Sequence, residues 1–129
     1  MNFKGQYQHT VDAKGRLFIP AKIREGLGDA CVASRAVKDP CLYVFSTEGW
    51  DWFTDRLGAT TDPLASDTEK KLGRITFASA TDCEFDSQGR ILITAALRQY
   101  ASIDKEVVIV GMANRVEIWA KEKWEEYSA

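Results

Sequence analysis

The feature that most constrains this chain is an internal repeat with a constant offset of 74 positions. Residues 12–24 read DAKGRLFIPAKIR, and residues 86–98 read DSQGRILITAALR, without a gap. The same offset relates Val44, Glu48 and Trp50 to Ile118, Glu122 and Trp124, and Phe3 to Phe77. The residues that recur identically in the two segments are Asp12, Gly15, Arg16, Ile19, Ala21 and Arg24. The chain therefore consists of two copies of one small unit.

The length of the chain indicates that the two copies share a core. A half of 129 residues is roughly 65 residues, and a unit of that size buries a poor fraction of its surface when it folds alone. The composition, 45% hydrophobic and 28% charged, is typical of a soluble globular protein. We find neither a signal-peptide pattern nor an apolar run of roughly 18 residues, so we expect a cytoplasmic protein without a membrane partner.

Charge is distributed unevenly along the chain, although its net value is only −2. Residues 1–24 contain five cationic residues and one acidic residue, a net charge of +4. Residues 46–71 contain six acidic residues against three cationic ones, a net charge of −3. A locally basic face can bind phosphates on an acidic chain, because counterion release depends on local contacts. The alternative is a solvated charged surface without a partner.

Each repeat opens with a pattern that predicts a β-hairpin followed by a short helix. Residues 6–11 alternate between polar and apolar, as in a half-buried strand. In the tight turn at residues 12–15, Asp12 is a side-chain turn former and Gly15 supplies a positive φ. A second strand is expected at residues 16–19, and Pro20 suits the start of a helix at residues 21–27.

The rest of the chain predicts an α+β fold, mostly β, with short flanking helices. Thr47 resembles an N-cap for a helix over residues 48–57, and Ser66 and Glu69 form a capping box for a helix that ends near residue 75. We expect a first repeat at 1–58, a linker and connecting helix at 59–76, and a second repeat at 77–129. The remaining expected strands are 30–36, 41–45, 79–85, 90–93, 106–112 and 115–119, and the remaining helices are 95–100 and a C-terminal one containing Trp124.

The repeated Gly-Arg turn is the best candidate for a functional site. A two-stranded β-ribbon fits the DNA major groove, and arginine can donate two hydrogen bonds to guanine O6 and N7. Lys14 and the backbone N–H groups of the turn could contact phosphates and fix the register. Arg16 and Arg90 each follow a turn glycine, so a duplicated module presents the contact twice. The alternative is a solvated turn that was duplicated with its domain.

Catalytic and metal-binding patterns are not found in the sequence. His9 is the only histidine, and its counterpart in the second repeat is Cys83, so no repeated nucleophile–base pair exists. The paired carboxylates Asp82 and Glu84 are expected to be solvated strand residues. The three cysteines, Cys31, Cys41 and Cys83, have no C-x-x-C spacing and are expected to be buried free thiols. We therefore predict no enzyme activity, no cofactor, no metal and no small-molecule substrate.

The motif also resembles a known family. Residues 12–20 resemble the motif of AbrB-type swapped-hairpin DNA-binding domains. Together with the tandem arrangement, residues 40–42, 97–101 and 117–119 make the whole chain similar to the MraZ family of bacteria. The resemblance implies that the two copies interleave into a pseudo-two-fold β unit. It further implies a nucleoid-associated transcriptional regulator, a repressor that binds repeats in its own promoter, upstream of the division and cell-wall gene cluster. It also implies ring-shaped homo-oligomers.

The resemblance assigns the DNA contacts to the two Gly-Arg turns. The residues concerned are Lys14, Gly15, Arg16, Gly89 and Arg90, and we expect additional phosphate contacts from Lys22, Arg24 and Arg98. The second copy has Gln88 in place of Lys14 and Thr94 in place of Pro20, so its turn is less basic. The alternative function is an oligomeric protein-interaction ring without DNA readout. A small enzyme is a distant third, because the chain lacks a nucleophile–base pair.

Overall fold

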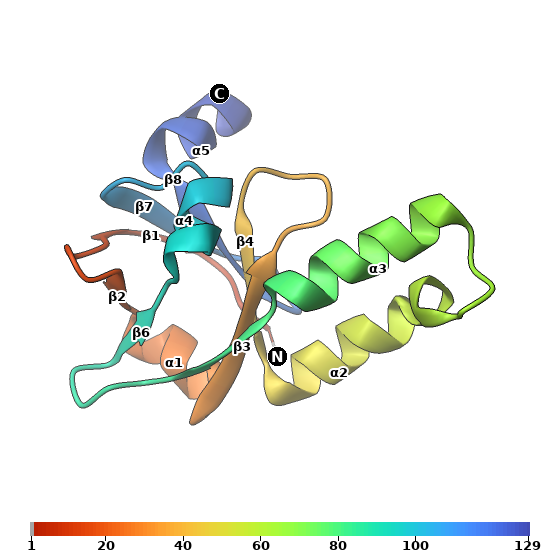
Figure 1. Cartoon of the computed structure of the whole chain (residues 1–129). Helices are drawn as coiled ribbons and strands as arrows, with labels where there is room; N and C mark the ends of the chain where they lie inside the picture. Colours follow the sequence, from red (N-terminus) through yellow and green to blue (C-terminus); the bar gives the residue numbers. More distant parts are fainter. Residues whose placement is uncertain (1) are drawn as a thin grey trace.

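The computed structural model describes residues 2–129 as a twisted sheet with helices on both sides (Figure 1). The strands are β1 (Gln6–Thr10), β2 (Arg16–Phe18), β3 (Ala30–Arg35), β4 (Leu42–Ser46), β5 (Thr81–Glu84), β6 (Arg90–Leu92), β7 (Glu106–Gly111) and β8 (Val116–Ala120). The helices are α1 (Ala21–Leu27), α2 (Thr47–Arg56), a 3₁₀ helix at Gly58–Thr61, α3 (Asp67–Ser79), α4 (Ala95–Tyr100) and α5 (Lys121–Ser128).

The two repeats exchange strands within one antiparallel sheet. The strand order is β1-β7-β8-β4-β3-β5, so β1 of the first repeat pairs with β7 of the second, and β5 of the second pairs with β3 of the first. The equivalent strands β4 and β8 meet in the middle, where Leu42 lies opposite Ile118 and Val44 opposite Val116. This order is symmetric about the β4–β8 pair. It confirms the α+β fold and the interleaved repeats that the resemblance implied.

The local hairpin predicted at the start of each repeat forms only at its turn, and the second strand has a different main partner. Strand β2 pairs with β6 and not with β1; only an isolated bridge joins Val11 to Leu17. The turn itself forms as expected, because the N–H of Gly15 donates to the Asp12 carbonyl at 2.9 Å. Strand β1 is instead paired with β7 in the six-stranded sheet. Pairing with β6 instead packs the side chains of Leu17 and Ile91 into the common core.

Two helix boundaries also differ from the sequence-based expectation. Helix α2 is capped by Ser46 rather than Thr47, since the Ser46 hydroxyl accepts the N–H of Gly49 at 3.0 Å. Helix α3 has the predicted capping box at Ser66 and Glu69, but it continues to Ser79. The strand expected to begin at residue 79 therefore begins only at Thr81. The division of the chain at residues 58 and 76 stays a prediction.

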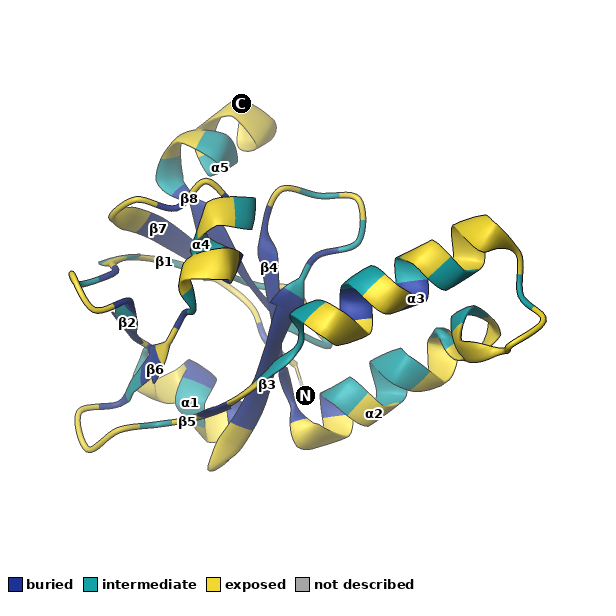
Figure 2. Ribbon diagram, in the orientation of Figure 1, coloured by how far each residue is buried: buried dark blue, intermediate teal, exposed yellow. Residues whose placement is uncertain are grey.

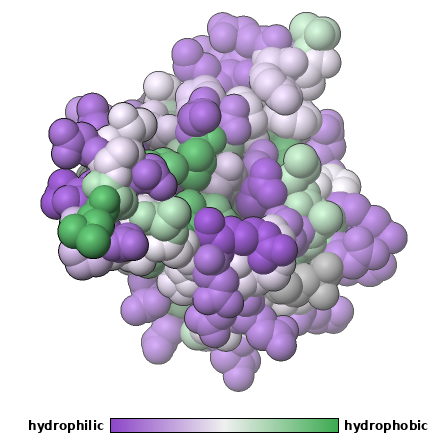
Figure 3. Space-filling model, turned by 90° about the vertical axis from the view of Figure 1, so that its right-hand side faces the viewer, coloured by the Kyte–Doolittle hydropathy of each residue, from purple (hydrophilic) through white to green (hydrophobic). Residues whose placement is uncertain are grey.

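The core lies on both faces of the six-stranded sheet (Figure 2). One face packs against the β2–β6 pair and helices α1 and α4, which supply Leu17, Ile23 and Leu97. The other face carries an aromatic cluster, in which Phe45 stacks on Phe53 of α2 at 4.9 Å between ring centroids. The tryptophans of this cluster therefore act in packing, as expected. Seen from the side of α2 and α3, the surface is largely hydrophilic (Figure 3).

The three cysteines are buried free thiols, as predicted. Cys31 on β3 lies directly opposite Cys83 on β5, so the two thiols meet across the junction of the two repeats. A hydrogen bond with Cys83, together with burial, raises the pKa of the Cys31 thiol. Burial likewise raises the pKa of Cys41. These two groups therefore remain protonated near neutral pH and behave as small apolar side chains.

Candidate nucleic-acid interface

Two turns of the same construction lie at the ends of the β2–β6 pair; we name residues 12–16 the first tip and residues 86–90 the second tip. In the first tip, one oxygen of Asp12 accepts the backbone N–H groups of Lys14 at 3.0 Å and Arg16 at 2.9 Å. In the second tip, Asp86 accepts those of Gln88 and Arg90, both at 2.9 Å. An aspartate side chain that satisfies its own turn explains why this residue opens both motifs.

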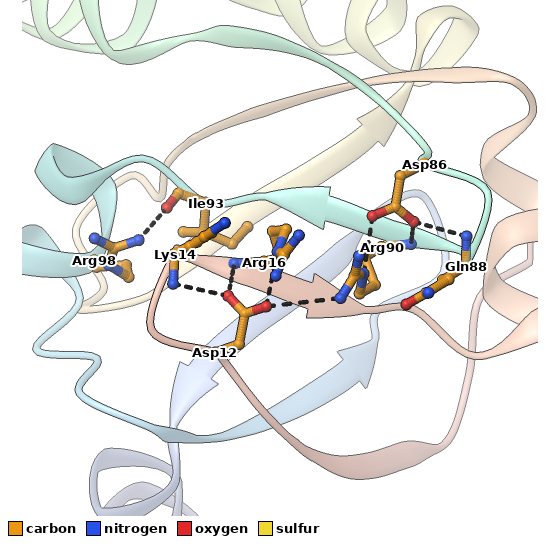
Figure 4. A network of polar contacts seen from close by, with 8 residues as sticks. All are labelled: Asp12, Lys14, Arg16, Asp86, Gln88, Arg90, Ile93 and Arg98. Carbon is orange, nitrogen blue, oxygen red and sulfur yellow. Dashed lines mark hydrogen bonds and ion pairs between the residues drawn. The ribbon is translucent and has the colours of Figure 1, made fainter.

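The second oxygen of each aspartate holds the arginine of its own tip (Figure 4). The Nε of Arg16 lies 2.8 Å from Asp12 Oδ2, and the Nε of Arg90 lies 2.8 Å from Asp86 Oδ2. The hydrogen bond from the backbone N–H of the tip arginine and the ion pair with its side chain lower the pKa of Asp12 and of Asp86. Both carboxylates are therefore charged at neutral pH and orient the guanidinium groups.

The two arginines differ in how much of the guanidinium is free. The side chain of Arg16 is 36% exposed, and its ion pair with Asp12 is the only one it forms among residues 2–129. The side chain of Arg90 is 24% exposed, and its Nη1 also lies 3.7 Å from Asp12 Oδ2. Asp12 thus contacts both arginines. Arg16 has both Nη groups available for another partner, whereas Arg90 has one of them close to a second carboxylate.

The outward face of the β2–β6 ribbon carries both arginines. Arg16 pairs with Leu92 and Phe18 with Arg90, whereas Leu17 and Ile91 are buried on the opposite face. Phe18 is 39% and Leu92 52% exposed, so each arginine has an apolar neighbour across the ribbon. Sequence reasoning missed these two apolar residues. The period-two alternation at residues 16–18 and 90–92 was the signal that could have identified them.

Each tip is fixed by the opposite repeat. The carbonyl of Gly15 accepts the N–H of Ile93 at 2.7 Å, and the carbonyl of Gly89 accepts that of Ile19 at 3.0 Å. Both glycines have a positive φ, +85° and +76°. A Cβ at Gly15 would collide with the Arg98 guanidinium and lie 2.8 Å from the Ile93 carbonyl oxygen. Glycine is therefore required for backbone conformation and for space.

Arg24 and Arg98, two of the expected phosphate contacts, occupy equivalent half-buried positions behind the tips. Nη1 of Arg24 donates to the Ile19 carbonyl at 2.8 Å beside Gly89, and Nη1 of Arg98 donates to the Ile93 carbonyl at 2.7 Å beside Gly15. Each of these arginines thus packs against the tip glycine of the other repeat and stabilises the backbone beside it. Lys14 and Lys22, in contrast, are exposed. The phosphate contacts of all four residues stay predictions.

The sequence segments that contain the two tips differ in net charge. Asp12 is the only acidic residue among residues 8–24, which also contain Lys14, Arg16, Lys22 and Arg24, a net charge of +3. The equivalent residues 82–98 contain Asp82, Glu84 and Asp86 against Arg90 and Arg98, a net charge of −1. Because Arg24 lies against Gly89 and Arg98 against Gly15, the difference in charge at the tips themselves is that Lys14 of the first tip is replaced by Gln88 in the second.

Other kinds of site find little support in the described part of the chain. Within residues 2–129 there is no group of three or more histidine, cysteine, aspartate or glutamate side chains placed to hold a metal ion. No helix over the same residues is long and apolar enough to cross a membrane. The ribbon with its two tips is thus the site that both the sequence and the fold single out. The fold thus consists of two swapped units that present paired arginines on one ribbon.

Comparison with known proteins gives the family. A model described as "MraZ protein, putative antitoxin-like" matches twice, at residues 2–75 and 76–129. The chain is 49% identical over 124 residues to "Transcriptional regulator MraZ" of Symbiobacterium thermophilum, which covers 96% of this chain and 88% of that protein. The chain therefore belongs to the MraZ family.

Further relatives agree with this assignment. The protein of the same name from Thermoanaerobacter sp. is 50% identical over 124 residues, 96% of this chain and 85% of that protein. The one from Heliobacterium modesticaldum is 45% identical over 126 residues, 98% of this chain and 86% of that protein. The expected family is confirmed. The relatives' name supports a transcriptional regulator, which is a non-enzymatic function and agrees with the prediction that this chain is not an enzyme.

Proposed function

We propose that this chain is a sequence-specific transcriptional regulator that binds double-stranded DNA with its β2–β6 ribbon. The observation that carries the proposal is the pair Arg16 and Arg90, which two repeats place on the outward face of one two-stranded ribbon. The major groove, about 12 Å wide, admits such a ribbon. The name of the relatives supports a role in transcription.

Base recognition falls mainly to Arg16 in this proposal. Its Nε is held by Asp12, and its two Nη groups are directed to the bidentate contact with guanine O6 and N7. The carboxylate fixes the side chain before binding, which lowers the entropy that the contact costs. Phe18 and Leu92 would meet thymine methyl groups beside the guanine, the apolar contact that the major groove offers.

Phosphate contacts fix the register of the ribbon on the duplex. Lys14, exposed at the first tip, and Lys22, exposed on α1, supply charge for these contacts. The remaining N–H groups of Arg24 and Arg98 supply it from behind the tips. The second tip has Gln88 where the first has Lys14, so it contributes a neutral hydrogen bond at most.

The full proposal also covers the target and the assembly. We infer a nucleoid-associated repressor of the division and cell-wall gene cluster, which binds adjacent repeats in its own promoter as a ring-shaped homo-oligomer. One chain has two small tips and a net charge of −2, so a single copy on one repeat is expected to bind weakly. Once one copy is bound, its neighbours meet the next repeats at high effective concentration, which can raise the affinity by roughly 10²–10⁴-fold.

A second function has one observation in its favour. Phe18 and Leu92, the last residues of β2 and β6, are exposed apolar residues on the outward face of the ribbon, and such residues also anchor protein–protein contacts. An oligomeric ring that binds a protein partner through this ribbon is therefore the alternative. The two functions differ in salt dependence, because phosphate contacts release counterions and an apolar protein contact does not.

The test is fluorescence anisotropy on the protein's own upstream region and on a scrambled duplex, each at two salt concentrations. The proposal predicts tighter binding to the upstream region and weaker binding to both duplexes at the higher salt. Operators with one, two and three repeats should show stepwise gains, and an insertion of about half a helical turn should remove most of that gain. Equal affinity for both duplexes would refute sequence-specific recognition, and the absence of salt-sensitive binding to either duplex would favour the protein-interaction ring.

A further inference from the structure

A second candidate site lies away from the ribbon, in a hollow between helices α3 and α4. The hollow has a volume of about 460 Å³, and the ends of strands β3 and β5 complete its wall. That volume is within the range of roughly 300–1,000 Å³ in which small molecules bind. Its wall joins the two repeats, since Arg35 belongs to the first repeat and Tyr100 to the second.

Arg35 is the distinctive residue of this hollow. Its guanidinium carbon lies 4.0 Å from the centroid of the Tyr100 ring, and the Tyr100 hydroxyl is itself fixed by donating to the Asp39 carbonyl at 2.7 Å. The Nε of Arg35 is buried and has no hydrogen-bond partner. A buried polar group without a partner costs free energy. Because Nε is enclosed by the chain, an acceptor from outside would bind Arg35 through its Nη groups, which form no hydrogen bond or ion pair with residues 2–129.

The wall of the hollow contains a second cation and no anion. Arg74 on α3 lines the hollow and forms no ion pair with any of residues 2–129. None of the lining residues is acidic. The hydroxyls of Ser79 and Thr94 are already used, since Ser79 accepts the N–H of Arg35 at 3.1 Å and Thr94 caps α4. The charged groups of the wall are therefore both cationic.

The rest of the wall is apolar and includes Ile75 and Leu97. We propose that this hollow binds a small organic anion, with its carboxylate or phosphate group against Arg35 and Arg74 and its apolar body against Ile75 and Leu97. Arginine suits this task because its planar fork of donors matches both kinds of anionic group. The apolar wall selects against inorganic anions, which gain nothing from it.

The experiment is isothermal titration calorimetry of the full chain with phenyl phosphate as the probe, beside inorganic phosphate and benzyl alcohol. We expect phenyl phosphate to bind with one site per chain, and each of the other two to bind at least roughly tenfold more weakly. Arg35→Gln should weaken phenyl phosphate by roughly tenfold or more, since a hydrogen bond to a charged group is lost.

Two further variants locate the effect. Arg56→Gln is the matched control, because Arg56 also lies over an aromatic ring, at 3.9 Å from the centroid of Trp52, but lies outside the hollow. It should bind phenyl phosphate like the parent chain. Ala96→Phe fills the hollow from an exposed position of α4 and should abolish binding while Arg35 is kept, which provides a test if Arg35→Gln does not fold.

Several results would overturn the proposal. They are the failure of phenyl phosphate to bind at millimolar concentration, unchanged binding by Arg35→Gln or Ala96→Phe, and inorganic phosphate binding as tightly as phenyl phosphate. A change in the mass of the assembly on Arg35→Gln, measured by light scattering, would show that the hollow is a contact between copies of the chain and would also refute the ligand site.

Discussion

The two tips share one construction but differ in three respects that all favour the first as the DNA-contacting one. Arg16 is more exposed than Arg90, and Arg90 alone lies near both aspartates. Lys14 at the first tip is replaced by Gln88 at the second. Duplication has thus kept the residues that form the turn, the glycine, the aspartate and the arginine, while the charge around the turn has diverged. The residues shared by both tips are those that form the turn, and the residues that differ are those that we propose to tune DNA binding.

The largest expected effect concerns the glycines. Gly15→Ala should destabilise the fold by roughly 2–4 kcal/mol, because an alanine is strained at φ +85° and its Cβ would meet the Ile93 backbone carbonyl as well as Arg98. Gly89→Ala should cost roughly 1–2 kcal/mol, because the nearest atoms there all belong to the flexible end of Arg24.

The control for both variants is Gly28→Ala, where φ is +81° and no atom lies within 4 Å of the added Cβ. Its ψ of −164° lies in a region that is essentially restricted to glycine, so this variant measures backbone strain without a steric contact, roughly 1–3 kcal/mol. The measurement is the free energy of unfolding from urea titrations. If all three variants lose the same stability, the close approach of the arginines to the tips has no energetic role.

The second prediction ranks the arginines. Arg16→Ala should reduce the affinity for the specific operator by about 1–3 kcal/mol per site, the value of a bidentate arginine–guanine contact, and Arg90→Ala should reduce it less. Both variants should fold, because each arginine is partly exposed. Anisotropy titrations beside thermal melting check this. An equal or larger loss on Arg90→Ala would reverse our ranking of the tips.

Much of this comparison could be predicted from the sequence, because the repeat, the turn chemistry and the helix signals are local. The tight turns at residues 12–15 and 86–89, the capping box at Ser66 and Glu69, and the buried thiols all follow from residue type and spacing. The two Gly-Arg turns were also identified correctly as equivalent positions, and the structure brings them onto one ribbon.

The partner of β2 could not be predicted from local pattern. Residues 16–18 fit a hairpin with β1 as well as a ribbon with β6, and only the burial of Leu17 and Ile91 together decides between them. The supporting roles of Arg24 and Arg98 were missed for the same reason: each packs against a glycine in the other repeat. A sequence does not show which basic side chain another part of the chain will cover.

The third prediction concerns a substitution that makes the second tip resemble the first. Gln88→Lys adds a cation at the position equivalent to Lys14, so it should strengthen binding to all sequences alike and steepen the salt dependence by about one unit. Lys14→Gln should have the opposite effect. The measurement is the slope of log affinity against log salt concentration on the operator and on a scrambled duplex. A change confined to the operator would assign these positions to base recognition instead.

The smallest effect concerns the aspartates and pH. The pKa of Asp12 and of Asp86 is lowered in the folded chain from the ordinary value of 3.8, mainly by the backbone N–H groups they accept. Their contribution to stability is therefore complete above that value and lost as the pH falls below it through the folded pKa. Between about pH 5 and pH 8 both carboxylates stay charged, so we expect these two groups to cause no change in melting temperature there. Asp12→Asn and Asp86→Asn should each reduce the loss of stability below pH about 4. An unchanged acid transition in both variants would contradict this.

The most direct test of the account is a double-mutant cycle between Arg16 and the operator guanines. Each guanine is replaced in turn by 7-deazaguanine, which lacks the N7 acceptor, and affinity is measured with the parent chain and with Arg16→Ala. The account predicts that one guanine replacement in each operator repeat lowers the affinity of the parent chain and does not change the affinity of Arg16→Ala. The coupling energy should be about 1–3 kcal/mol. Additive effects at every guanine would show that Arg16 does not contact a base, and the β2–β6 ribbon would then not be the reading element.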